Sequence, residues 1–171
     1  MHRAYVSLGS NINPEHYLLN GIRLLGNHFL DVVASSFYTY EAEGFEGPDF
    51  LNCAAAFSTS LEPHDLKNKL RQIEAFLGRN RDQHGMKSRV IDIDLLLYGH
   101  LEWNSDQLVL PHPEILTQAY VLRPLREIAS DLTLPGTDMT IESLWKQSRW
   151  FSTDTLNPVL DANQVREILT G

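Results

Sequence analysis

The sequence predicts an α+β fold, and three observations lead to that prediction. Segments in which apolar and polar residues alternate are interleaved with segments whose apolar residues recur at helical spacing. Between residues 4 and 98 these segments follow the order strand, helix, strand, strand, helix, strand. The chain of 171 residues is long enough to bury roughly 70% of its unfolded surface. We therefore expect one compact domain in which helices pack on an antiparallel sheet.

The first strand and the first helix are marked by a change of period. Residues 4–8 alternate as a strand does and run into a loop signal at residues 9–11. Asn13 can serve as the N-cap of a helix with Pro14 at its first position, and apolar residues follow at helical spacing. The Gly26-Asn27 pair is expected to end this helix.

Two strands and a second helix are expected next. Residues 30–40 have period two, residues 41–49 hold glycines and a proline typical of a loop, and residues 50–59 read as a partly buried strand. Pro63 opens a helix whose apolar residues recur at helical spacing until Gly78. The apolar stripe of this helix must face the sheet.

The strand signal is clearest at residues 90–98, which end at Gly99. The resulting βαββαβ order is that of the ferredoxin-like arrangement, in which two helices cover one face of an antiparallel sheet. The other face is left for added elements or ligands. Expected additions are a C-terminal hairpin within residues 99–110, helices over residues 120–130 and 140–146, and a terminal helix capped near Asn157.

Composition and charge narrow the classes of function. Lys and Arg number 14 and Asp and Glu number 22, giving a net charge of −8, which argues against a sequence-independent duplex binder. No run of about eighteen apolar residues could span a bilayer, and the single cysteine cannot form an internal disulfide. We expect a cytoplasmic monomer with no nucleic-acid or membrane partner. Residues 1–149 are expected to form the domain, and residues 150–171 a tail that can be helical within the same compact unit.

Asp92 and Asp94 form the sharpest chemical motif. On a strand their carboxylates project from one face, roughly 6.5 Å apart, while Ile91 and Ile93 project from the other. Hard oxygen ligands suit Mg²⁺, and two ions about 3.5–4 Å apart could clamp the oxygens of a phosphoryl displacement. The D-x-D pattern is short. Taken alone, it is therefore equally compatible with two aspartates on the solvent-exposed face of a strand that bind no metal.

Four positive charges, Arg79, Arg81, Lys87 and Arg89, immediately precede or flank this motif. Arginine forks suit phosphate oxygens. Residues 79–88 contain almost no apolar anchor, so we expect this segment to be mobile until a ligand orders it. A basic loop beside a metal-binding strand indicates a polyphosphate site that closes over its substrate, whereas the alternative is a solvated run of charge.

Seven short motifs extend the signal beyond the aspartate pair. They are LGSN at residues 8–11, SSFY at 35–38, GPDFLN at 47–52, IEAFLGRNR at 73–81, RVIDIDLLLYG at 89–99, LPHP at 110–113 and VLRPLREIA at 121–129. Over roughly residues 4–145 the chain resembles the 6-hydroxymethyl-7,8-dihydropterin pyrophosphokinases of folate biosynthesis. The resemblance implies transfer of pyrophosphate from ATP to the hydroxymethyl group of the pterin, with release of AMP.

The resemblance also implies roles for residues at the phosphate end of the site. Asp92 and Asp94 would hold two Mg²⁺ ions. Arg79, Arg89 and His112 match positions that contact the ATP phosphates, where Arg81 would assist, and residues 79–88 match a catalytic loop that closes. The residues expected to carry catalysis are Arg79, Arg89, Asp92 and Asp94, acting by positioning and charge stabilisation without a named general base.

On the pterin side, Phe50 and Tyr120 match aromatic positions that sandwich the ring, and Asn52 matches a position that hydrogen-bonds its polar edge. Stacking between two aromatic faces suits a flat bicycle, while an amide suits its donor and acceptor atoms. Core packing is the alternative for both aromatic residues.

The chain departs from the family pattern at several positions. Gln118 stands where the family commonly has an arginine on the ATP triphosphate, Met86 where some members carry a tryptophan, and residues 41–44 are acidic in place of a proline-containing loop. These departures leave two alternatives open. One is a pterin- or nucleotide-binding paralogue with weak or no turnover, and the other is a D-x-D metal-dependent nucleotidyl or glycosyl transferase.

Overall fold

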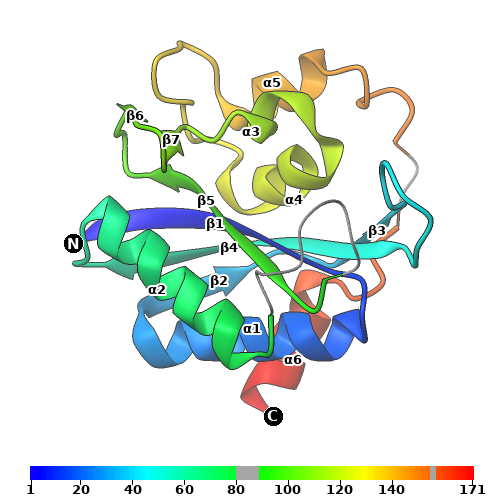
Figure 1. The fold of residues 1–171 in the computed structure, drawn as a ribbon. Coiled ribbons are helices and arrows are strands. Elements are labelled where there is room, and N and C mark those ends of the chain that lie inside the picture. The colour runs from blue at the N-terminus through cyan, green and yellow to red at the C-terminus, as the bar shows by residue number, and fades with distance from the viewer. Residues whose placement is uncertain (80–88, 155–156) are drawn as a thin grey trace.

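The computed structural model describes residues 1–79, 89–154 and 157–171, in which an antiparallel sheet runs between two groups of helices (Figure 1). The strands are β1 (His2–Ser10), β2 (Leu30–Ala34), β3 (Tyr38–Tyr40), β4 (Phe50–Thr59), β5 (Asp92–Tyr98), β6 (Trp103–Asn104) and β7 (Val109–Leu110). The helices are α1 (Pro14–His28), α2 (Pro63–Phe76), α3 (Glu114–Thr117), α4 (Ala119–Ala129), α5 (Ile141–Gln147) and α6 (Ala162–Thr170). Among the described residues, no helix is both long and apolar enough to cross a membrane.

The first strand of the chain lies in the middle of the main sheet. The strand order is β2-β4-β1-β5, with β3 paired to the other end of β4, and every pairing is antiparallel. In this register Gly9 of β1 lies opposite Asn52 of β4 on one side and Asp92 of β5 on the other. The end of β1 therefore meets residues predicted for both halves of the site.

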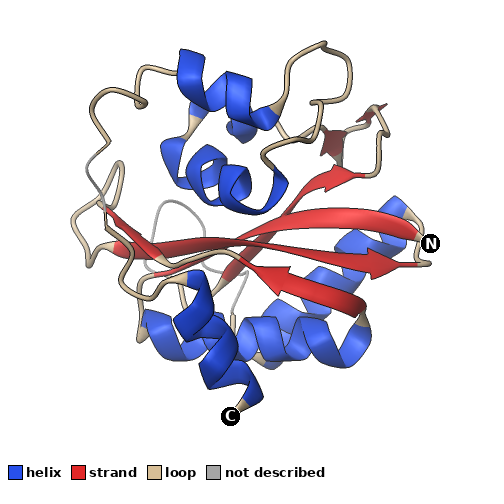
Figure 2. Ribbon diagram, turned by 180° about the vertical axis from the view of Figure 1, so that it is seen from behind, coloured by secondary structure: helices blue, strands red, loops and turns tan. Residues whose placement is uncertain are grey.

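Each face of the sheet has its own apolar core, and Figure 2 shows the sheet between the two helical layers. Helices α1 and α2 cover one face, where Ile93 and Leu95 of β5 are buried. Helices α4 and α5 cover the other face, where Leu96 and Leu97 are buried. The side chains of β5 change face because the register between β1 and β5 shifts: Tyr5 pairs with Leu97, whereas Val6 pairs with Leu95.

The mixed helix and antiparallel-sheet architecture confirms the α+β class predicted from the sequence, and most predicted elements are found within a few residues of their expected bounds. The period-two stretch at residues 30–40, however, forms two strands instead of one. The Ser35 hydroxyl accepts the Ala54 N–H at 2.8 Å, and the Ser36 N–H donates to the Glu127 carboxylate. These side-chain bonds replace the sheet ladder at the break.

Two helix ends differ from the sequence prediction. Asn13 is the N-cap of α1, but its left-handed backbone (φ 44°) leaves its side chain without a capping bond. The terminal helix begins at Ala162 and not near Asn157, because Asp161 and Gln164 form a capping box. The residues before the box are held extended, since Leu160 pairs with Phe37.

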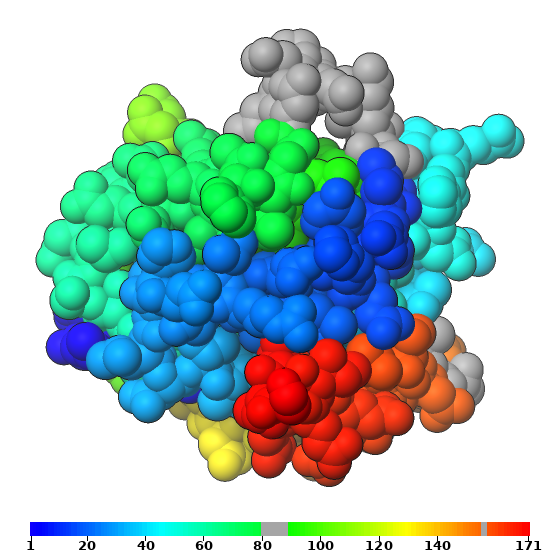
Figure 3. Space-filling view, turned by 90° about the horizontal axis from the view of Figure 1, so that it is seen from below, coloured from blue at the N-terminus to red at the C-terminus, as the bar shows by residue number. Residues whose placement is uncertain are grey.

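Helix α3 has no counterpart among the predicted elements, and its four residues are too few for a periodic signal. Helix α6, in contrast, lies within residues 150–171, the tail for which the sequence predicts a possible helix. In Figure 3 the C-terminal residues, drawn red, lie against the blue residues of α1, and α6 also contacts β2.

Candidate functional site

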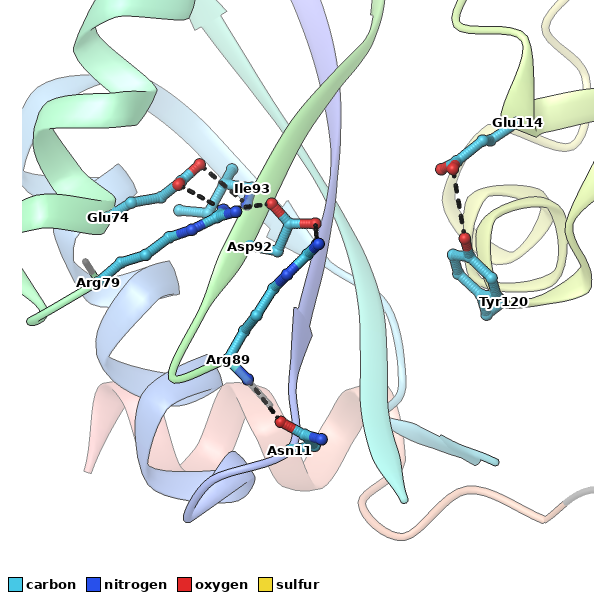
Figure 4. A network of polar contacts seen from close by, with 8 residues as sticks. All are labelled: Asn11, Glu74, Arg79, Arg89, Asp92, Ile93, Glu114 and Tyr120. Atoms are coloured by element: carbon cyan, nitrogen blue, oxygen red, sulfur yellow. Dashed lines mark hydrogen bonds and ion pairs between the residues drawn. The ribbon is translucent and has the colours of Figure 1, made fainter. Parts of the chain in front are cut away.

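Asp92 lies at the start of β5 between two arginine side chains (Figure 4). Arg79 Nη1 binds Asp92 Oδ1, and Arg89 Nη1 lies 3.0 Å from Asp92 Oδ2. Both arginines border residues 80–88, which lie outside the described part of the chain. The structure therefore brings the two predicted phosphate-binding cations to the carboxylate that was predicted to bind metal.

Glu74, on the last turn of α2, fixes the first of these arginines. Its carboxylate is 1% exposed, and it accepts Arg79 Nη1 at 2.7 Å and the Ile93 N–H at 3.2 Å. Burial alone would lower the pKa of Arg79, but the carboxylates of Asp92 and Glu74 outweigh burial and raise that pKa. The guanidinium therefore stays charged although it is largely enclosed.

Asn11 of the LGSN motif fixes the second arginine through the backbone. The Arg89 N–H donates to Asn11 Oδ1 at 2.7 Å, and the Asn11 N–H donates to the Arg89 carbonyl at 3.1 Å. The Asn11 amide also donates to the Pro48 carbonyl at 3.2 Å. One buried side chain thus ties the approach to β5 to the loop that precedes β4.

Asp94, His112 and Glu114 each place one potential ligand atom within 4.8 Å of the others. Within the described chain, no hydrogen bond or ion pair reaches the Asp94 carboxylate. Burial, followed by the charges of Asp92 and Glu114, raises the pKa of Asp94 to about 8. A bound cation would relieve this unfavourable burial of charge, and the carboxylate oxygens that Asp94 and Glu114 place within 4.8 Å of each other suit a hard divalent ion.

The hydrogen bonds of His112 assign its tautomer. The Glu114 N–H donates to His112 Nδ1 at 3.2 Å, so the proton of the neutral ring lies on Nε2. Burial lowers the pKa of His112, which keeps the ring neutral near pH 7. His112 can therefore donate one hydrogen bond from Nε2, as suits a phosphate oxygen, and has no free lone pair for a metal.

A cavity of about 270 Å³ lies beside the aspartates and is walled by aromatic rings. Phe45 and Phe50 meet edge to face with their centroids 6.4 Å apart. Tyr40 and Tyr120 form a second edge contact at 6.2 Å. The four rings together enclose a space suited to a flat heterocycle.

Polar groups line the same cavity between the rings. Asn52 is 5% exposed and faces the cavity from β4, and Gln118 faces it from the start of α4. Asp92, Asp94 and Glu114 also border it. An occupant of this cavity would therefore contact an aromatic wall, side-chain amides and the aspartate pair at once.

A second cavity of about 290 Å³ lies on the other side of Asp94. His112 borders it, together with Lys67 and Arg71 of α2. Lys67 Nζ donates to the Gln107 carbonyl, which also lies at this cavity. Asp94 borders both cavities, so it stands where two ligands could meet.

Most of the predicted site residues thus converge on one place. The first cavity is bordered by Phe50, Asn52, Arg89, Asp92, Asp94, Gln118 and Tyr120. Gln118, which the resemblance assigned to the ATP phosphates, lies with the predicted pterin residues and does not border the second cavity. Arg81 and the rest of the predicted closing loop lie outside the described residues.

Four contributors to the site were missed by the sequence reasoning, namely Glu74, Glu114, Tyr40 and Phe45. Glu74 lies within the IEAFLGRNR motif, and its place in that motif was the available signal. Tyr40 precedes the loop between β3 and β4, and Phe45 lies in it. Only tertiary contacts bring this loop to the cavity. Glu114 has no distinguishing local pattern.

The sequence of this chain is similar to those of known pyrophosphokinases. Residues 5–130 match the sequence model of the 7,8-dihydro-6-hydroxymethylpterin-pyrophosphokinase (HPPK) family. The chain is 38% identical over 160 residues to the 2-amino-4-hydroxy-6-hydroxymethyldihydropteridine pyrophosphokinase of Haemophilus influenzae, covering 91% of this chain and 98% of that protein. The protein of the same name from Methylorubrum extorquens is 43% identical over 140 residues, covering 80% of this chain and 88% of its own.

Solved structures show the same fold at low sequence identity. The wild-type HPPK-DHPS of Plasmodium falciparum with pteroate superposes with a TM-score of 0.68 at 11% identity. The match covers 92% of this chain and 45% of that one, so this chain spans less than half of the larger protein. From the family match and the identity to relatives of similar length, the chain belongs to the 7,8-dihydro-6-hydroxymethylpterin-pyrophosphokinase family.

Proposed function

We propose that this chain transfers pyrophosphate from ATP to 6-hydroxymethyl-7,8-dihydropterin and releases AMP, as a step of folate biosynthesis. The family and the names of the relatives support this reaction. The observation that carries the proposal is the position of Asp94, which borders both an aromatic cavity and a polar one whose lining includes Lys67 and Arg71. Pyrophosphate transfer needs a flat acceptor and a polyphosphate donor to meet at such a point.

The pterin is proposed to bind in the first cavity, between Phe50 and Tyr120. Each aromatic contact would add about 0.5–1.5 kcal/mol beyond the burial of area. Asn52, almost fully buried opposite Gly9, would hydrogen-bond the polar edge of the ring. Tyr40 and Phe45 extend the aromatic wall and would exclude water from the ring faces.

ATP is proposed to bind through the second cavity with its phosphates directed at Asp94. His112 would donate Nε2–H to a phosphate oxygen, since its other nitrogen is occupied. Arg79 and Arg89 now neutralise Asp92, and an arriving polyphosphate offers each guanidinium a second partner. Partial transfer of the guanidinium groups to the phosphates would free Asp92 oxygens.

The freed carboxylate of Asp92, together with Asp94, is proposed to hold two Mg²⁺ ions. When bound, these ions would supply Lewis-acid polarisation and neutralisation of the bridging phosphates. The protein contributes the remaining steps by position. The cavity walls would place the hydroxymethyl oxygen in line with the β-phosphorus, and the arginines would stabilise charge as the bond to AMP breaks.

The ferredoxin-like arrangement is also proposed for the core of this fold. Support comes from the strand order β2-β4-β1-β5 and from the placement of α1 and α2 on one face, with the short β3 as an addition. A cytoplasmic monomer is likewise proposed, and the names of the relatives support its action on small molecules.

Incubation with ATP, MgCl₂ and the hydroxymethyl dihydropterin tests the function directly. AMP and the pterin pyrophosphate should form in equal amounts, as measured by chromatography. Release of pyrophosphate instead would identify a nucleotidyl transferase, and binding of both ligands by calorimetry without AMP would identify an inactive paralogue. The Asp92→Ala and Asp94→Ala variants should each lower kcat by about 100-fold or more under saturating Mg²⁺.

A further inference from the structure

The side chains of Glu114 and Tyr120 meet at one wall of the first cavity. Glu114 opens α3, and Tyr120 lies in the first turn of α4. The Tyr120 hydroxyl donates to Glu114 Oε1 at 3.4 Å, and Figure 4 shows this pair across the site from the arginine cluster. This contact therefore belongs to the cavity and is separate from the ion pairs of Asp92.

The ring of Tyr120 is restrained from a second direction. Tyr40 meets it edge to face at 6.2 Å, with an angle of 66° between the ring planes. The Tyr40 hydroxyl donates to the carbonyl of Ala119, next to Tyr120 in the chain, at 3.4 Å. With the hydroxyl held by Glu114 and one side held by Tyr40, the ring loses little further freedom when a flat ligand stacks on it.

The hydroxyl of Tyr120 acts as the donor in this contact. Burial raises the pKa of Tyr120, and the neighbouring Glu114 carboxylate raises it further, so the phenol stays protonated. The Glu114 carboxylate therefore accepts from a protonated hydroxyl and can fix the orientation of the Tyr120 ring.

We propose that Glu114 is a positioning residue that acts through Tyr120 and sets the ring at the wall against which the pterin stacks. This inference rests on the proposed function, because it assigns the pterin to the first cavity. It goes beyond that function, since it makes affinity for the pterin depend on a hydrogen bond that lies outside the stacked rings.

The charge of Glu114 has a second effect that must be separated from this one. Its carboxylate lies within 4.8 Å of the ligand atoms of Asp94 and His112, so any loss of charge also alters the phosphate end of the site. Glu114→Gln removes the charge but keeps an acceptor for the Tyr120 hydroxyl. Glu114→Ala removes both, and Tyr120→Phe removes only the hydroxyl.

Calorimetry with 6-hydroxymethyl-7,8-dihydropterin and with Mg-ATP separates the two effects. Glu114→Ala and Tyr120→Phe should each weaken pterin binding by about 2-fold to 10-fold, while Glu114→Gln stays within about 2-fold of wild type. Glu114→Ala introduced into Tyr120→Phe should weaken pterin binding no further. Any change in Mg-ATP affinity should be the same for Glu114→Gln and Glu114→Ala, because both lose the charge.

The exposed Glu167→Ala on α6 is the matched control and should leave both affinities unchanged. Equal pterin affinity in wild type, Glu114→Ala and Tyr120→Phe would overturn the inference, as would additive losses in the double variant. If Glu114→Ala fails to fold, Tyr120→Phe alone decides, since unchanged pterin binding by that variant refutes the inference. If the wild type forms AMP and these variants bind pterin normally, only this inference is refuted. If the wild type neither binds nor converts pterin, the proposed function is refuted as well.

Discussion

The carboxylate of Glu74 lies 2.7 Å from the guanidinium of Arg79 and is almost completely buried, with 1% of the side chain exposed. The other Glu74 oxygen accepts the N–H of Ile93 in β5. A single side chain therefore links the end of α2, the strand proposed to bind metal and an arginine proposed to bind phosphate. Because a charge buried this deeply is costly without its partner, the pair is expected to be structural as well as functional.

Glu74→Gln tests the structural part. The variant leaves the enclosed Arg79 without one of its two anions, and we expect the free energy of unfolding to fall by about 2–3 kcal/mol. Urea unfolding followed by circular dichroism measures this change. Asp65→Asn, an exposed carboxylate in the first turn of the same helix, should cost less than about 1 kcal/mol. Equal losses in the two variants would show that burial of the Glu74 pair is unimportant.

Asp94 should make the metal-free protein less stable as the pH rises. Its pKa is raised to about 8 by burial and by Asp92 and Glu114, whereas an unfolded aspartate titrates near about 3.9. Between these values the folded state holds a proton that the unfolded state has lost, so stability falls as the pH rises from about 4 to about 8. Asp94→Asn should flatten this dependence, as measured by thermal unfolding in EDTA between pH 5 and pH 8.

Asp92→Asn should behave in the opposite way. Asp92 is bound by both Arg79 and Arg89, so removal of its charge should lower the melting temperature at pH 8, where Asp94→Asn should raise it. Added Mg²⁺ should stabilise the wild type more than either variant. A shift of the same sign in both variants would contradict the different environments that the structure assigns to the two aspartates.

Gly9 is expected to be required for the position of Asn52. A Cβ at residue 9 would lie 2.7 Å from Asn52 Oδ1, so Gly9→Ala must displace the amide proposed to read the pterin edge. Pterin affinity should fall about 3-fold to 10-fold by calorimetry, with a smaller change for Mg-ATP. Gly26→Ala in α1 is the matched control, since no heavy atom other than nearby chain and helix backbone lies within 4 Å, and it should stabilise the fold by about 0.5–1 kcal/mol. Unchanged pterin binding by Gly9→Ala would show that Asn52 does not contact the ligand.

Ser36 should contribute to stability by joining α4 to the C-terminal helix. Its hydroxyl donates to Glu127 Oε1 at 2.6 Å and accepts the Ala162 N–H at 2.9 Å. Ser36→Ala leaves both partners short of a bond, and we expect a loss of about 1–3 kcal/mol in urea unfolding. Ser152→Ala, at an exposed position, should change stability by less than about 0.5 kcal/mol. A loss no larger than this control would show that water replaces the hydroxyl.

Local patterns predicted the parts of the site that lie on one strand. Alternation placed Asp92 and Asp94 on a face opposite Ile93, and the structure buries Ile93 in the core beneath α1 and α2. Glu74 could not be assigned in this way, because its burial depends on contact between α2 and β5. The break at Ser35 and Ser36 was missed for a similar reason, since period two continues through the sequence while their hydrogen bonds reach Ala54 and Glu127.

Residues from separate segments required either the resemblance or the fold. Phe50 and Tyr120 look like core residues in isolation, and only the cavity that they share with Asn52 distinguishes them. The contact between Glu114 and Tyr120 depends on the angle between two short consecutive helices, which no periodic pattern encodes. Gln118 matches a family position assigned to the ATP phosphates, yet it borders the first cavity. A match in sequence therefore does not determine which cavity a side chain borders.

The central place of β1 in the sheet constrains the order of events during translation. β1 is synthesised first, yet its partners β4 and β5 begin only at Phe50 and Asp92. Until both have left the ribosome, the nascent chain exposes the two edges of an apolar strand whose Val6 and Leu8 are fully buried in the folded protein. Asp92 and Asp94 arrive with the last of these three strands, so the site proposed for metal and nucleotide cannot form before the sheet closes.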